Sequence, residues 1–308
     1  MIAFRAWFSG FGQVLRAPFT TVAVMLLTLL AAIPFGLVLG DRLQTALNDQ
    51  PPIMLGSEEI DADWWLEFRR HAEGLEATFT PAIIGFAAPL SSLSDVLDGT
   101  PRGMAMALPL AVAIVMWAFI WGWAIERFRS GGSRSASALI RAGARAWPRF
   151  VAISIGAAIA QLLLYLTIHP LLFRVIFPPL TASLTHERDA FLVRLALYAV
   201  FGVFLVMVSL VADYVRIASA IAGASMGSGL AFVGRHWRSA AALFLIGAAI
   251  LGVLFVSYGI GEAYGGSRVG GWRGVAIGQL FIVARLALRL IGIAAGVRLY
   301  ERLGPTRR

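Results

Sequence analysis

The chain has 308 residues, of which 59% are hydrophobic and 14% are charged, and it contains no cysteine. Because about a quarter of the residues of a typical soluble domain are charged, this composition excludes an ordinary soluble globular protein. The lack of cysteine excludes disulfides and thiolate metal sites. The formal net charge of +9 would suit a nucleic-acid-binding protein. However, most arginines flank apolar stretches, and we therefore expect no nucleic-acid partner.

Six long apolar stretches predict membrane spans, because a helix of about 20 apolar residues matches the ~30 Å hydrocarbon core of a bilayer. The stretches cover residues 18–40, 104–124, 151–169, 191–212, 240–258 and 274–297. The first exceeds the apolar core of a typical signal peptide, so we expect an uncleaved span. The sequence therefore predicts an all-α polytopic membrane helix bundle, with six transmembrane helices arranged as three hairpins in a single integral membrane domain over residues 1–308.

The charges of the connecting segments predict the orientation. The segment between spans two and three carries six Arg and one Glu, whereas residues 41–103 carry eleven acids and four Arg. Arginine accumulates on the cytoplasmic side of membrane proteins. We therefore expect both termini to be cytoplasmic, in the cytoplasmic (inner) membrane of a bacterium. The anionic headgroups of membrane lipids are the expected partners of the cytoplasmic arginines.

A related motif precedes spans one, three and five. It lies at residues 12–19, 142–150 and 232–238, and spans three and five then share the string Ile-Gly-Ala-Ala-Ile. Each motif follows an amphipathic stretch that contains arginine. Such stretches bury an apolar face in the membrane interface and pair arginine with headgroups. We therefore expect a short interfacial amphipathic helix before each hairpin.

The sequence resembles a family of uncharacterised six-span bacterial inner-membrane proteins. The resemblance rests on Arg16-Ala-Pro, on Arg235-His-Trp, on Ala212-Asp-Tyr-Val-Arg-Ile and on the order of the hairpins. Relatives of that family include the membrane domain attached to some glycerophosphoryl diester phosphodiesterases. The resemblance implies a membrane location and a lipid-related or transport role, and it implies no catalytic residues.

Residues 41–103 are expected to form an extracytoplasmic helical segment. Residues 41–47 are expected to continue span one, and residues 60–77 have the pattern of an amphipathic helix that contains Trp64 and Trp65. Two interpretations stay open for the adjacent tryptophans. They could anchor a protein partner in the membrane, because indole is enriched at binding hot spots, or they could rest in the outer headgroup region.

Two arginines at membrane depth are the strongest candidate site. Arg285 lies near the middle of span six and Arg289 lies one turn further along, and Gly292 and Gly296 continue the same helical stripe. Charged side chains are costly in lipid, so this stripe should face other helices or a wet cavity. The glycines would permit close approach of a neighbouring backbone, and Asp213 in span four is the candidate counter-charge.

A second polar stripe lies on span three. Its members are Ser154, Gln161, Tyr165 and His169. We expect spans three, four and six to converge on one polar interior that contains this stripe. In one interpretation the arginines of span six bind an anionic substrate or lipid headgroup, and in the other they only fix the packing of the helices.

No catalytic motif is present in the sequence: it lacks a P-loop, a nucleophile elbow and a zinc-protease motif. We therefore expect no catalytic residues, no metal and no cofactor, and we expect a non-enzymatic, permease-like or lipid-interacting membrane component. The alternative is a structural or assembly subunit of a larger membrane complex, docked through the Trp-bearing outer segment. A third alternative is a lipid enzyme that uses Asp213 or His169.

The predicted orientation can be tested by cysteine labelling, because the natural chain has no cysteine to remove. In right-side-out vesicles, Ser57→Cys should react with a membrane-impermeant maleimide, whereas Ser137→Cys should react only after the membrane is permeabilised. The reverse pattern would overturn the predicted topology.

Overall fold

Helices form every regular element that the computed structural model describes, and the described residues are 2–49, 62–72, 97–98, 107–131, 133–222, 226–261 and 272–304. Six of these helices are long and apolar enough to cross a membrane. They are α2 (Pro18–Asp49), α5 (Ala107–Arg129), α6 (Ala136–Pro170), α8 (Glu187–Ala222), α9 (Met226–Gly261) and α10 (Trp272–Leu303). The all-α fold class with six long apolar helices is confirmed.

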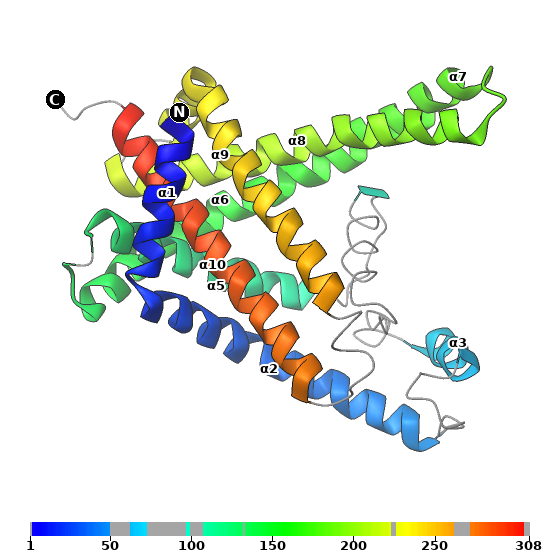
Figure 1. Cartoon of the computed structure of the whole chain (residues 1–308), viewed down its shortest axis with the longest axis horizontal. Helices are drawn as coiled ribbons and strands as arrows, with labels where there is room; N and C mark the ends of the chain where they lie inside the picture. The colour runs from blue at the N-terminus through cyan, green and yellow to red at the C-terminus, as the bar shows by residue number, and fades with distance from the viewer. Residues whose placement is uncertain are drawn as a thin grey trace.

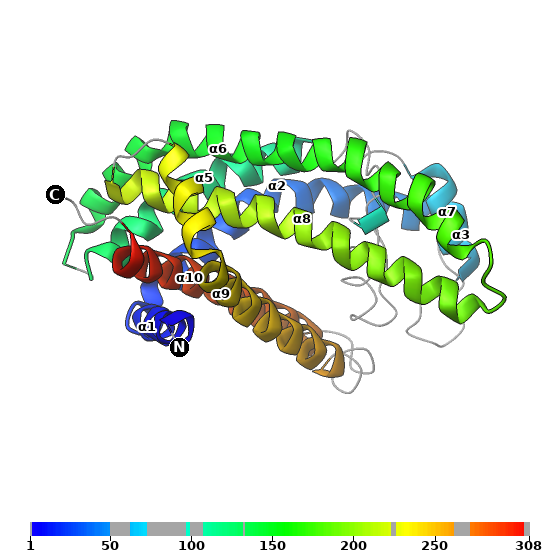
Figure 2. The ribbon, with the colours of Figure 1, turned by 90° about the horizontal axis from the view of Figure 1, so that it is seen from above.

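The helices are arranged so that α6 lies beside α8 and α9 lies beside α10 (Figure 1). Both chain termini lie at the same end of the molecule (Figure 1), as an even number of spans requires. From that end the α6/α8 pair and the α9/α10 pair diverge, as Figure 2 shows. The helix α5 packs against α6 and also contacts α8 and α10, so it lies between the two pairs.

The helix α10 is the centre of the bundle. Within its most apolar 18-residue window 44% of the residues are buried, against 6% in the corresponding window of α2. It contacts α1 (Ile2–Leu15), α2, α5, α8 and α9. The other spans expose long rows of leucine, valine and phenylalanine, which suits side chains that face lipid rather than water.

The first of the expected interfacial helices is a separate element, α1, which runs across the direction of α2 (Figure 1). One of its faces buries Ala3, Ala6 and Gly10 against the bundle. The opposite face exposes four large apolar side chains at helical spacing: Phe4, Phe8, Phe11 and Leu15. An exposed apolar face on a helix across the spans is the arrangement expected of a helix in the membrane interface.

The other two entry motifs differ from α1. The motif before span three is continuous with α6, in spite of Pro148. The motif before span five belongs to α9, where a kink at His236 (φ −120°, ψ 27°) separates it from the span. The helix α6 ends at Pro170, next to the expected end of span three at residue 169. The helical path nevertheless continues beyond it through a π-helical turn, η3 (Leu171–Ile176), and α7 (Phe177–Thr181).

The outer segment is described in part. The helix α2 extends to Asp49, which confirms that residues 41–47 continue span one. The expected amphipathic helix is present as α3 (Ala62–His71), and it includes Trp64 and Trp65, whose side chains lie outside the described part of the chain.

Several glycines set close contacts between helices, and one of them, Gly296, is in the stripe of span six, where a Cβ would lie 2.9 Å from Cδ1 of Ile217 on α8. A Cβ on Gly10 would lie 2.7 Å from the backbone nitrogen of Ala295, so α1 packs directly on the backbone of α10. A Cβ on Gly229 would lie 2.6 Å from Cα of Val215, which brings α9 equally close to α8. The expected role of Gly292 in close packing is wrong, because nothing lies within 4 Å of its Cβ position.

We predict that Gly10→Ala destabilises the protein, because its methyl group overlaps the backbone of α10. Overpacking of this kind costs about 1–3 kcal/mol. The matched control is Gly12→Ala on the same helix, where the Cβ position is open. That substitution should be neutral or stabilise α1 by up to about 1 kcal/mol through helix propensity. Thermal midpoints in detergent measure both effects, and equal midpoints for the two variants would contradict the packing of α1 on α10.

Candidate binding cavity

A cavity of about 460 Å³ lies beside α10, and Arg285 and Arg289 are part of its wall. The wall also includes residues of α1, α2, α5, α8 and α9. Both arginine side chains keep exposed surface although α10 is the most buried span. The cavity provides this open surface, since Gly292 contributes no side chain to fill it.

Most of the remaining wall is apolar. The cavity is bordered by Leu243, Phe244 and Leu251 of α9 and by the indole rings of Trp7 and Trp117. The two guanidinium groups therefore face a space in which hydrocarbon surface predominates. A cavity of this size falls within the range of about 300–1,000 Å³ that small-molecule sites occupy.

Arg289 is held in place by an aromatic ring. Its Cζ atom lies 3.6 Å from the ring centroid of Trp117 on α5, which is a close cation–π contact. Such a contact stabilises by about 2 kcal/mol or more when water is excluded. Stacking on one face leaves the edge of the planar guanidinium, with its N–H donors, free to meet a ligand.

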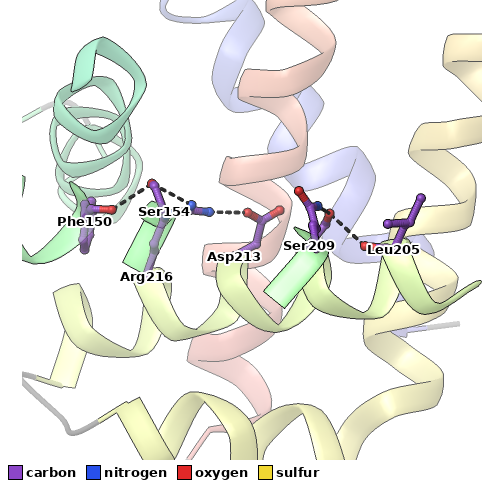
Figure 3. Close-up of polar contacts among 7 residues, drawn as sticks. Phe150, Ser154, Leu205, Ser209, Asp213 and Arg216 are labelled. Carbon is purple, nitrogen blue, oxygen red and sulfur yellow. Dashed lines mark hydrogen bonds and ion pairs between the residues drawn. The ribbon is translucent and has the colours of Figure 1, made fainter. Parts of the chain in front are cut away.

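Asp213 also lies in the wall, and it pairs with its own helix rather than with α10. Arg216 Nη1 donates to Asp213 Oδ1 at 2.8 Å, and Arg216 Nη2 donates to Ser154 Oγ at 3.0 Å. Ser154 Oγ in turn donates to the carbonyl of Phe150 at 2.8 Å, so a polar chain joins α8 to α6 (Figure 3). The hydrogen bonds of Asp213 thus go to Arg216, whereas its interaction with Arg289 of span six is electrostatic and acts over a longer distance.

The two members of the ion pair differ in exposure. The Arg216 side chain is 11% exposed and is packed with its Cζ 5.2 Å from the ring centroid of Trp121. The Asp213 side chain keeps 43% of its surface open, although it lies deep among the helices, because it borders the cavity. Arg216 thus acts as the buried partner that permits a carboxylate at this depth.

The charges around the cavity do not balance. Asp213 is already paired with Arg216. Neither Arg285 nor Arg289 forms an ion pair within 4.0 Å with any carboxylate of the described residues. Two guanidinium charges therefore face the cavity, and an anion is the ligand that would compensate them.

The other three candidate residues, all on α6, do not line this cavity. Gln161 Nε2 donates to Ser209 Oγ at 3.2 Å, which ties α6 to α8. Tyr165 and His169 each pack edge-to-face against Phe201, at centroid distances of 5.1 and 5.2 Å. The structure therefore divides the expected single polar interior into a cavity beside α10 and a packed α6/α8 contact.

Sequence reasoning missed two residues that shape the site. Trp121 lies near the end of an apolar stretch, where tryptophan is typical of the headgroup region, but it is 5% exposed and its ring lies against Arg216. Trp117, which holds Arg289, was not singled out. The available signal was the spacing of Trp117 and Trp121 by one helical turn on α5, opposite the arginine pair, which is also spaced by one turn.

The comparisons with known proteins add no relative. No protein-family model, no curated protein and no solved structure matches this chain. Within the described part of the chain, no three His, Asp or Glu side chains come together as a metal site would require.

We predict that Arg216→Leu destabilises the protein, because it leaves the Asp213 carboxylate without its hydrogen-bonded partner. The loss should lie below the ~3–5 kcal/mol of a fully buried ion pair, because the Asp213 side chain is 43% exposed. The double variant Asp213→Asn/Arg216→Leu should recover much of the loss, since the unpaired charge is gone. Thermal unfolding in detergent measures this coupling, with Arg188→Leu at an exposed position of α8 as the control. Purely additive effects of the two substitutions would refute the pairing.

Proposed function

We propose that this chain is a non-enzymatic integral membrane protein that binds an anionic amphiphile in the cavity beside α10. It would act as a permease-like or lipid-interacting component of a bacterial inner membrane, with both termini cytoplasmic. The observation that carries the proposal is the pair of guanidinium groups, Arg285 and Arg289, in the wall of a largely apolar cavity of about 460 Å³.

The chemistry of the wall supports this class of ligand. Arginine presents a planar fork of donors that matches carboxylate and phosphate oxygens, and the excess of guanidinium charge over carboxylate favours an anion. The surrounding leucine, phenylalanine and tryptophan side chains favour a hydrocarbon chain attached to that anion. A phosphate or carboxylate group attached to a hydrocarbon chain would bind the guanidinium groups through its oxygens and the apolar side chains through its chain.

The arrangement of acid and base groups supports binding rather than catalysis. Among the described residues of the cavity wall, Asp213 is the sole carboxylate, and it is engaged by Arg216. His169, the other group considered for a lipid enzyme, lies among aromatic rings away from the cavity wall. A general acid or base has to reach the reacting group within hydrogen-bonding distance.

We predict that dodecyl phosphate stabilises the purified protein against heat more strongly than dodecyl maltoside or dodecyltrimethylammonium. Arg285→Gln should raise the dodecyl phosphate concentration that gives half of the stabilising effect about 10–100-fold. The reason is that a hydrogen bond to a charged group contributes about 1.5–3 kcal/mol. The control is Arg302→Gln, an exposed arginine of the same helix outside the cavity wall. It should leave the response unchanged.

The variant Gly292→Phe separates binding from folding. Because nothing lies within 4 Å of the Gly292 Cβ position, a phenyl ring enters the cavity without displacing a backbone. It should preserve the thermal midpoint of the free protein and abolish the response to dodecyl phosphate. A wild-type protein that responds equally to the three amphiphiles, or an Arg285→Gln variant that responds like wild type, would reject the proposed function.

A further inference from the structure

A second, smaller pocket of about 270 Å³ lies between α5, α6 and α8, and the function proposed for the cavity beside α10 does not use it. Arg145 and Arg149, one helical turn apart on α6, line it together with Glu126 of α5 and Ser219 of α8. Phe150, which is 1% exposed, also lines the pocket. The pocket therefore combines two cations with a carboxylate and a hydroxyl.

The pocket lies where polar sequence gives way to apolar sequence. Arg149 comes immediately before the apolar stretch that begins at residue 151, and Glu126 lies one turn before the end of α5 at Arg129. Groups at this boundary lie at the level of lipid headgroups, and basic pockets between transmembrane helices bind such headgroups. Gly122, which lines the pocket, lets α5 pack tightly on α6, because a Cβ on Gly122 would lie 3.1 Å from Cα of Gly143.

The carboxylate has unused hydrogen-bonding capacity. The Glu126 side chain is 15% exposed, and its Oε1 lies 3.0 Å from Nε of Arg134. That contact lacks the geometry of a hydrogen bond, and the enclosed Oε1 accepts none from any described residue. A buried carboxylate oxygen without a donor is unfavourable. A ligand that brings its own N–H donors into the pocket would remove this deficit.

We propose that this pocket binds a phosphate ester that also carries a primary ammonium group, with phosphoethanolamine as the headgroup chemistry. The phosphate oxygens would lie against Arg145 and Arg149, and the ammonium group would donate to Glu126. The two cations of the pocket would thus meet the phosphate of the zwitterion, and its carboxylate would meet the ammonium group. The site is separate from the cavity beside α10 and does not depend on the function proposed there.

The chemistry predicts a ranking of headgroups. Phosphatidylglycerol offers the phosphate but no ammonium, so Oε1 of Glu126 would stay without a hydrogen-bond donor. Phosphatidylcholine offers a cation with no N–H donor. Phosphatidylethanolamine supplies both the phosphate for the arginines and the donors for the carboxylate, so it should bind best.

The test is a titration of the purified full chain with dioctanoyl lipids, followed by thermal shift and native mass spectrometry. The wild-type protein should bind the ethanolamine lipid at least fivefold more tightly than the glycerol or choline lipid. Glu126→Gln should reduce the preference for ethanolamine over glycerol to less than twofold. Arg145→Gln and Arg149→Gln should each weaken binding of both lipids tenfold or more.

Two further variants keep the test decisive. Ala142→Phe places a ring in the pocket without a change of charge, and it should abolish the headgroup preference even if Glu126→Gln does not fold. Arg141→Gln, one turn before Arg145 and outside the pocket wall, is the matched control and should behave like wild type. Arg285→Gln should also leave the preference intact, which distinguishes this site from the cavity beside α10.

Soluble phosphoethanolamine distinguishes the two sources of the headgroup. If it binds at least as tightly as the dioctanoyl lipid, the ligand is a free phosphate ester; if it binds tenfold or more weakly, the ligand is a lipid in the membrane. Equal binding of the three lipids by the wild-type chain would overturn the proposal. Retention of the wild-type preference in Glu126→Gln, or in both arginine variants, would overturn it as well.

Discussion

The structure depends on how guanidinium groups are accommodated among apolar helices. A charge in a medium of low dielectric constant needs a partner, an aromatic face or an open space. The chain uses all three: Arg216 pairs with Asp213, Arg289 stacks on Trp117, and Arg285 faces the cavity. The central position of α10 follows from this requirement, because a helix with two arginines near its middle cannot be placed at the lipid boundary.

Close contacts between backbones fix helices that contribute residues to the cavity wall. Gly10 allows α1 to pack directly on α10, and Gly229 allows α9 to pack on α8. Gly292 faces the open space between these contacts. The cavity therefore exists because tight contacts hold the surrounding helices in place while one position of α10 is left without a side chain, and interiors packed to normal density do not relax to fill such a gap completely.

The polar chain between α6 and α8 lies between the two pockets. Asp213 borders the cavity beside α10, and Phe150 borders the smaller pocket. Arg216 and Ser154 connect them through hydrogen bonds of 2.8 to 3.0 Å. A connected chain of this kind fixes the relative position of two spans more specifically than apolar packing, since its hydrogen bonds form in one register. Together with the bond from Gln161 to Ser209, it holds α6 beside α8 over about two helical turns.

The sequence by itself determined the number of long apolar helices, their approximate limits, the separate helix α1 and the placement of the Arg285/Arg289 face of α10 among other helices. These properties follow from hydropathy and helical spacing along one segment, which tertiary contacts do not alter. Only the tertiary structure decided that Asp213 pairs with Arg216, that Trp121 is buried, and that Tyr165 and His169 lie apart from the arginines of α10. Each of these depends on how neighbouring helices rotate about their axes, and small residues such as Gly10 and Gly229 set that rotation through contacts between segments far apart in the sequence.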